Sequence, residues 1–103
     1  MRMLLKAQVS TETANAVLKD GSLGDTLNSI LADTKPEAVY FLIEDGFRTV
    51  LVVFDMQDLA DMPAIVEPWF LALGANVKIT PVLNGDDFAN AGPSLGAVVQ
   101  KYG

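Results

Sequence analysis

Polar side chains within otherwise apolar β-rich segments are the residues best placed to do chemistry in this chain. Lys6 and Gln8 are two positions apart in one such segment, so in a strand they would share a face. Lys78 and Thr80 repeat this spacing in a later segment. A lysine on an apolar face would attract an anionic substrate, so both pairs are candidates for a binding site.

Tyr40 and Thr49 are a third candidate pair, because the turn between them fixes their register. Asp45-Gly46 separates the β-rich residues 37–44 and 47–55, and this dipeptide suits the positive φ angles of a type I′ turn. A two-residue turn here sets Tyr40 and Thr49 on one face of a hairpin. If that face coincides with the face of Lys6, a few polar groups would converge in an apolar wall, as is typical of small-molecule sites. Tyr40 would then hydrogen-bond the ligand or donate a proton to it.

A structural role is the alternative for the same residues. Lysines at sheet edges extend their charged ends into solvent while their stems pack on apolar neighbours. Tyr40 would in that case pack at an interface between subunits.

The stretch Glu67-Pro68-Trp69-Phe70 is a further candidate. Pro68 lacks an amide hydrogen and is expected to kink a helix, so Glu67 and Trp69 could share a desolvated pocket that suits a carboxyl group to proton transfer. The alternative is a kinked helix with Trp69 in the core and Glu67 in solvent. Together these interpretations give a predicted ligand-binding set of Lys6, Gln8, Tyr40, Thr49, Glu67 and Trp69.

Two missing residue types exclude much of the common chemistry. The chain has no cysteine and no histidine. Disulfides, thiolate catalysis, Ser-His-Asp catalysis, His-ligated haem and ordinary zinc sites are therefore absent. Asp55, Asp58 and Asp61 do not form a calcium-loop pattern, and helix capping explains the last two. We expect no metal and no cofactor, and the sequence assigns no catalytic residue.

Net charge and hydropathy limit the classes of partner that this chain is expected to bind. The 103 residues carry a net charge of −6 without any basic cluster, which argues against nucleic acid and anionic membrane surfaces. No window approaches the roughly 20 apolar residues needed to cross a bilayer, and no secretory signal is visible. A cytoplasmic location is expected. Half of the residues are hydrophobic, which is much for one small domain and suggests a buried interface with a second copy.

The periodicity of apolar residues predicts the order β-α-β-β-α-β followed by a C-terminal helix. Residues 2–9 alternate as a strand, and a helical region with a break near Asp20-Gly21-Ser22 follows them. Beyond the hairpin, residues 59–73 are helical and residues 77–83 form a strand, with Pro81 best tolerated at a sheet edge. This order is the split βαβ arrangement, an α+β ferredoxin-like fold with an antiparallel sheet. We expect one domain spanning residues 1–103.

The hairpin register leaves two apolar faces on the sheet. One face carries Tyr40, Leu42 and Leu51, and the other carries Phe41 and Val50. Helices of one chain cover only one of these faces. A partner sheet or a returning C-terminal helix are the two candidates for covering the other.

The topology and length resemble those of the dimeric α+β barrel superfamily, in which two ferredoxin-like sheets associate face to face. Muconolactone isomerases, stress-responsive barrel proteins and antibiotic-biosynthesis monooxygenases belong to that group. Residues 35–41 (KPEAVYF), 67–70 (EPWF) and 81–84 (PVLN) also resemble small uncharacterised bacterial proteins of this shape. The resemblance implies the fold and a homodimer, and it carries over no catalytic residue. The lack of histidine sets the chain apart from the haem-degrading members.

Two functions follow from these observations. The first is an isomerase, monooxygenase or simple binder that uses the barrel cavity for a small apolar or anionic molecule. The second is a non-catalytic structural or ligand-sensing dimerisation module. An RNA-binding sheet is a third possibility, and the acidic charge argues against it.

Overall fold

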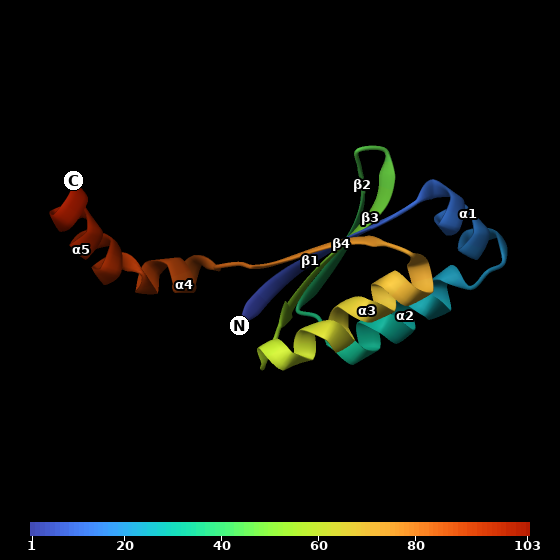
Figure 1. Cartoon of the computed structure of the whole chain (residues 1–103), viewed down its shortest axis with the longest axis horizontal. Helices are drawn as coiled ribbons and strands as arrows, with labels where there is room; N and C mark the ends of the chain where they lie inside the picture. The colour runs from blue at the N-terminus through green and yellow to red at the C-terminus, as the bar shows by residue number, and fades with distance from the viewer.

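Four antiparallel strands form one sheet in the order β2-β3-β1-β4, with helices on one side of it (Figure 1). The computed structural model describes all 103 residues. The order of strands and helices is that of a ferredoxin-like fold, so the predicted α+β class is confirmed. The elements are β1 (Arg2–Val9), α1 (Thr11–Lys19), α2 (Leu23–Thr34), β2 (Ala38–Glu44), β3 (Phe47–Asp55), the short 3-10 helix η1 (Leu59–Asp61), α3 (Met62–Leu73), β4 (Asn76–Pro81), α4 (Gly85–Asn90) and α5 (Gly92–Tyr102).

The β2–β3 hairpin has the turn and register that its sequence predicts. Asp45 and Gly46 have φ angles of 54° and 79°, as a type I′ turn requires. Glu44 pairs with Phe47 across the turn, and Tyr40 pairs with Leu51 further along. The hairpin therefore fixes which side chains of β2 and β3 share a face.

The helical region after β1 is broken where the sequence predicted. Gly21 has a φ of 81°, and the amide of Ser22 donates to the Asp20 carboxylate over 2.8 Å. Hydrogen bonding from the side chain and the backbone of Ser22 holds the pKa of Asp20 below its ordinary value. The break separates α1 from α2, and α2 packs against α3.

Two boundaries near α3 and β4 differ from the prediction. The predicted helix 59–73 begins as the 3-10 helix η1, so α3 itself starts only at Met62; it ends at Leu73, as predicted, with Gly74 as its cap at a left-handed φ of 54°. The strand β4 starts one residue earlier and ends two residues earlier than predicted, at Pro81. One hydrogen bond to β1 lies beyond the end of β4: the Val82 amide donates to the Arg2 carbonyl over 3.1 Å. As expected, Pro81 lies in an edge strand.

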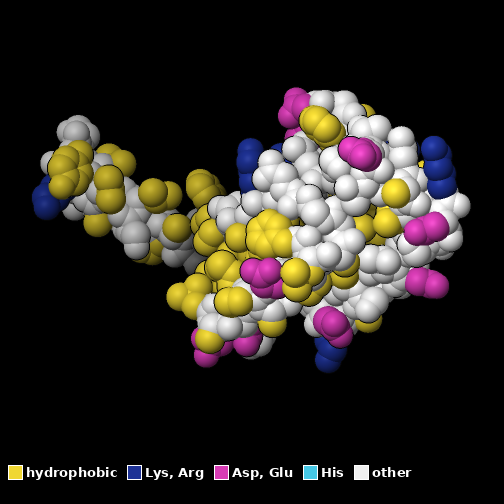
Figure 2. Space-filling model, turned by 45° about the vertical axis from the view of Figure 1, so that its right-hand side comes forward, with side chains coloured by type: hydrophobic (Ala, Val, Ile, Leu, Met, Phe, Trp, Pro, Cys, Tyr) yellow, Lys and Arg dark blue, Asp and Glu magenta, His cyan; other side chains and the backbone are white.

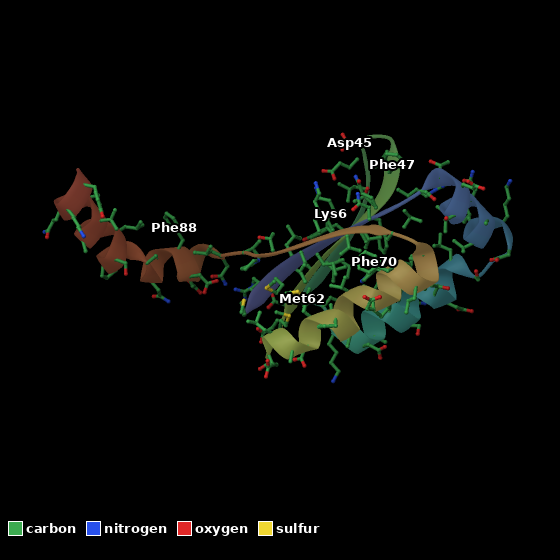
Figure 3. All side chains as sticks on the ribbon, in the orientation of Figure 1. Lys6, Asp45, Phe47, Met62, Phe70 and Phe88 are labelled. Atoms are coloured by element: carbon green, nitrogen blue, oxygen red, sulfur yellow. The ribbon has the colours of Figure 1, made fainter.

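The core lies between the sheet and the helices α1, α2 and α3. Strand β1 contributes every second residue to it, and α3 contributes Trp69 and Leu73, which are 1% and 0% exposed. Figure 3 shows Met62 and Phe70 of α3 on this side of the sheet, whereas Lys6 points to the other side. The core side chains are Met3, Leu5, Ala7, Val9, Ala14, Ile30, Val50, Val52, Phe54, Met56, Trp69, Leu73 and Ala75.

No helix of the chain covers the opposite side of the sheet, which we call the open face (Figure 1). Apolar side chains alternate there with polar ones and are only partly buried. The β2–β3 hairpin therefore presents the second apolar face that was predicted, whereas β1 and β4 add mainly polar side chains to it. The open face comprises Arg2, Leu4, Lys6 and Gln8 of β1, Ala38, Tyr40, Leu42 and Glu44 of β2, Phe47, Thr49, Leu51, Val53 and Asp55 of β3, and Asn76, Lys78 and Thr80 of β4.

The C-terminal segment, residues 82–103, does not return to the open face. We call this segment the arm. It continues beyond the end of β4 and holds two helices, α4 and α5, where one interrupted helix was expected (Figure 1). The molecule is consequently elongated, with extents of 59 × 28 × 19 Å. Of the two candidates for covering the open face, the returning C-terminal helix is thus wrong, because the arm leads away from the sheet.

The arm leaves the sheet in a fixed direction. Asn84 and Asp87 form a capping box at the start of α4, and each side chain bonds the backbone amide of the other residue. Arg2 at the start of β1 bonds Asp87 over 3.1 Å and Glu37 over 3.0 Å. The hydrogen bond and charge of Glu37 are the main reasons that the pKa of Arg2 is raised. None of the helices has the length and apolar character needed to span a lipid bilayer.

Candidate functional site

The side chains of the open face are arranged in rows that run across the sheet. The central row consists of Tyr40 on β2, Leu51 on β3, Lys6 on β1 and Lys78 on β4. Neighbours in such a row have Cβ atoms about 4.5–5.5 Å apart. The structure thus brings Lys6, Tyr40 and Lys78 together on one face, with an aliphatic side chain between the tyrosine and the lysines.

Lys6 and Lys78 are directly opposed, which is an unfavourable arrangement for two like charges. The Lys6 ammonium forms an ion pair with Glu44 over 2.8 Å. The Lys78 ammonium has no carboxylate within 4.0 Å. One positive charge of the pair is therefore uncompensated by the chain.

Glu44 is a residue of this site that sequence reasoning missed. Its carboxylate forms the ion pair with Lys6 and also accepts a hydrogen bond from Gln8 Nε2 over 3.3 Å. Arg48, which also lies beside the turn, does not reach Glu44, because it projects to the helix side, where its guanidinium donates to Asn15 over 2.9 Å. The hairpin register already set Glu44 and Arg48 on opposite faces, so this signal was present in the sequence.

Thr49 lies on the open face, yet it is only 2% exposed. Strand β3 lies between β1 and β2, so the contact of Gln8 with Glu44 crosses over β3 at this level. The Thr49 hydroxyl is already used, since it donates to the Phe47 carbonyl over 3.0 Å. Thr49 therefore offers no free polar group to a ligand, and the amide of Gln8 is engaged with Glu44.

Tyr40 is an accessible polar group of the central row. The residue is 61% exposed, and its hydroxyl makes no hydrogen bond within the chain. Tyr40 lies on the edge strand β2, and Lys78 lies on the other edge strand, β4. A ligand lying across the central row would meet a free hydroxyl at one end and a free ammonium at the other.

Glu67 and Trp69 do not belong to this site. Trp69 is 1% exposed in the core beneath the other face of the sheet, and Glu67 is exposed on α3. Neither residue lines any of the three cavities in the structure. Their arrangement agrees with the alternative considered from the sequence, an aromatic side chain in the core and a carboxylate in solvent.

An apolar groove lies on the helix side, beside the edge strand β2. We call it the β2 groove; its walls are Leu23 and Leu27 of α2 and Phe41 and Ile43 of β2. Its volume is about 280 Å³, and 9 of its 11 lining residues are hydrophobic. Arg48 is one of the two polar exceptions. The groove is separate from the central row, because Phe41 and Ile43 alternate with Tyr40 and point to the opposite side of β2.

Comparisons with known proteins support the fold. No family model matches the chain, and no curated protein matches its sequence. Among solved structures, 5-chloro-2-hydroxyhydroquinone dehydrochlorinase (TftG) from Burkholderia phenoliruptrix, in complex with 2,5-dihydroxybenzoquinone, has a TM-score of 0.63 and 12% identity. The match covers 84% of this chain and 97% of that one.

A formyltetrahydrofolate deformylase from Pseudomonas putida has a TM-score of 0.51 and 15% identity. That match covers 80% of this chain but 29% of the deformylase, so this chain corresponds to a small part of the larger protein. At such identities both likenesses establish the architecture alone.

Proposed function

We propose that this chain is a homodimeric α+β barrel protein that binds or converts a small anionic molecule on its open face. The observation that carries the proposal is the central row, where Lys6 and Lys78 are directly opposed and Tyr40 lies in line with them. An anion between the two ammonium groups would relieve their repulsion. The partly buried Leu4, Leu42 and Leu51 around them would supply the apolar wall that such sites usually have.

A second copy is the proposed cover of this site. The hairpin part of the open face leaves Tyr40 and Phe47 exposed in a single copy, and the chain's own arm leads away from it. Two open faces packed against each other would enclose both central rows and exclude water from them. Exclusion of water strengthens the attraction between an ammonium group and an anion.

The class of ligand follows from the two ends of the row. The ligand needs an anionic group between Lys6 and Lys78 and a flat apolar part that lies over Leu51, with an oxygen on its far side that accepts from Tyr40. Hydroxylated aromatic acids and hydroxyquinones have these features. The dihydroxybenzoquinone bound to TftG is a molecule of this kind, which makes it a suitable first probe.

The test is a titration of the full-length protein with 2,5-dihydroxybenzoquinone and with benzoate, followed by calorimetry and by NMR shifts of the amides of β1 and β4. We expect Lys78→Ala to weaken binding about tenfold or more, because it removes a charge-assisted hydrogen bond. Tyr40→Phe should weaken binding of the quinone more than binding of benzoate. Lys19→Ala, which removes an exposed lysine of α1, is the matched control and should leave both affinities unchanged.

Glu44→Gln should change the affinity in the opposite direction. It removes the carboxylate that competes for Lys6 and should raise the affinity for both anions by about twofold to fivefold, the range of an exposed ion pair. Equal affinities for all these variants, or no binding by either probe, would exclude a ligand at the central row. Spectral change of the quinone during incubation would separate conversion from binding, and saturable binding without conversion would favour the ligand-sensing module.

A further inference from the structure

The arm carries an apolar surface that nothing in its own chain covers. Leu95, Val98, Val99 and Tyr102 recur at three- and four-residue spacing on α5, and they are 47–75% exposed. Phe88 of α4 is 65% exposed. No residue of either helix is buried. Figure 2 shows these hydrophobic side chains along the arm and where it joins the body.

Helices of this kind do not persist in water by themselves. The helix α5 has 11 residues, below the roughly 12–15 at which an isolated helix becomes even marginally stable. Gly96 lowers its helix propensity further. The radius of gyration is 17.2 Å, whereas a compact chain of this length has about 13 Å. The helical arm therefore requires a surface on which its apolar stripe packs.

The β2 groove is an apolar surface that no element of its own chain fills. Phe41 and Ile43 are 64% and 71% exposed, although they lie on the helix side of the sheet, where Val50, the β3 partner of Phe41, is buried. Helix α2 forms the second wall with Leu23 and Leu27 and leaves the space between them empty. An amphipathic helix that inserts residues at i, i+3, i+4 and i+7 is the usual occupant of such a groove.

The arm of the same chain is badly placed to fill this groove. The arm and α1 lie at opposite ends of the long axis of the molecule, and the groove is on the α1 side (Figure 1). The Arg2–Asp87 ion pair joins the start of the arm to β1 and favours its outward direction. A second copy presents the same groove without this restriction.

We propose that α5 of one copy docks in the β2 groove of a second copy, and that reciprocal exchange of the two arms joins the chains. The stripe from Leu95 to Tyr102 packs against Phe41 and Ile43 in a twofold-symmetric pair of contacts. This exchange goes beyond the proposed ligand site, because it uses the other side of the sheet. It can fail while ligand binding succeeds, and the reverse also holds.

Cysteine cross-linking tests the contact directly, since the chain has no cysteine of its own. Val98→Cys is made in a chain with one affinity tag and Ile43→Cys in a chain with another, and the two full-length proteins are mixed and mildly oxidised. A disulfide forms only where the two Cα atoms approach within about 7 Å. We expect the mixed disulfide to exceed, by tenfold or more, that formed by Val98→Cys with Leu71→Cys, which is on the exposed side of α3.

The chain that carries both Val98→Cys and Ile43→Cys distinguishes exchange from folding back. Exchange gives a disulfide between two chains and therefore a covalent dimer. Folding back gives a disulfide within one chain and therefore a monomer. A disulfide within one chain would overturn the proposal, as would equal yields for Ile43→Cys and Leu71→Cys.

A charge introduced in the arm supplies a second measurement. Val98→Asp should raise the dissociation constant of the dimer about tenfold or more, because it buries a carboxylate in a groove lined mainly by hydrophobic residues. Gln100→Asp introduces the same charge on the opposite side of α5 and should have little effect. Analytical ultracentrifugation measures both constants, and equal values for the two variants would contradict docking through the stripe.

Discussion

At the scale of single residues, Asp20 shows how a short-range hydrogen bond fixes a junction between elements. Its carboxylate accepts from the Ser22 amide over 2.8 Å, in the turn where α1 ends and α2 begins. The bonds from Ser22 lower the pKa of Asp20, and burial opposes them only weakly. The charged form of Asp20 is therefore favoured in the folded state.

This lowered pKa predicts a dependence of stability on acid. The contribution of Asp20 is fully present above its unfolded pKa, near 4, and is lost as the pH falls through its lower folded value. Asp20→Asn should thus be less stable than the parent at pH 7, and the difference should shrink below about pH 4. Urea denaturation between pH 2 and pH 7, followed by the fluorescence of the single tryptophan, measures it. A difference that stays constant over this range would contradict the assignment.

At the scale of elements, the hairpin and the break between α1 and α2 were predictable because local residues determine them. Asp45-Gly46 specifies its turn without reference to the rest of the chain. The pairing of Lys6 with Glu44 was not predicted, because it depends on β1 lying beside β3, which is a contact between distant segments. The course of the arm was not predicted either: an apolar stripe shows that a helix needs burial but not which surface provides it.

Two glycines test whether local backbone geometry determines these elements. Gly46 has a positive φ of 79°, and Gly24 lies in α2 with helical geometry, and a Cβ atom would meet no neighbour at either position. Gly46→Ala should therefore destabilise the protein by about 1–2 kcal/mol through backbone strain alone. Gly24→Ala should stabilise it by about 0.4–1 kcal/mol, since alanine restricts the unfolded chain. The midpoints of urea denaturation should move in opposite directions, and a shift of the same sign would contradict this account.

At the scale of the whole molecule, the apolar composition and the elongated shape have one explanation. The hairpin part of the open face, the β2 groove and the arm all leave large apolar side chains exposed in a single copy. The proposed second copy would cover these side chains and so account for the hydrophobic half of the sequence. Folding and association are then linked.

Linkage predicts that thermal stability depends on protein concentration. Because association stabilises the folded state by mass action, the Tm should rise by roughly 3–6 °C for each tenfold increase in concentration. Calorimetry at several concentrations measures this, and light scattering should give twice the chain mass of 11.0 kDa. A Tm independent of concentration would show that the monomer is the stable unit.

The strand order β2-β3-β1-β4 also has a consequence for how the protein behaves outside its assembly. Both outer strands present unpaired backbone groups, but they are not equally protected. Strand β4 carries a lysine and ends in a proline, which discourage further strand pairing. Strand β2 carries Tyr40, Phe41, Leu42 and Ile43 without an interrupting charge. During refolding from denaturant at high concentration, β2 is therefore the strand at which chains would add to one another into aggregates, and a lysine introduced there should raise the yield of recovered protein.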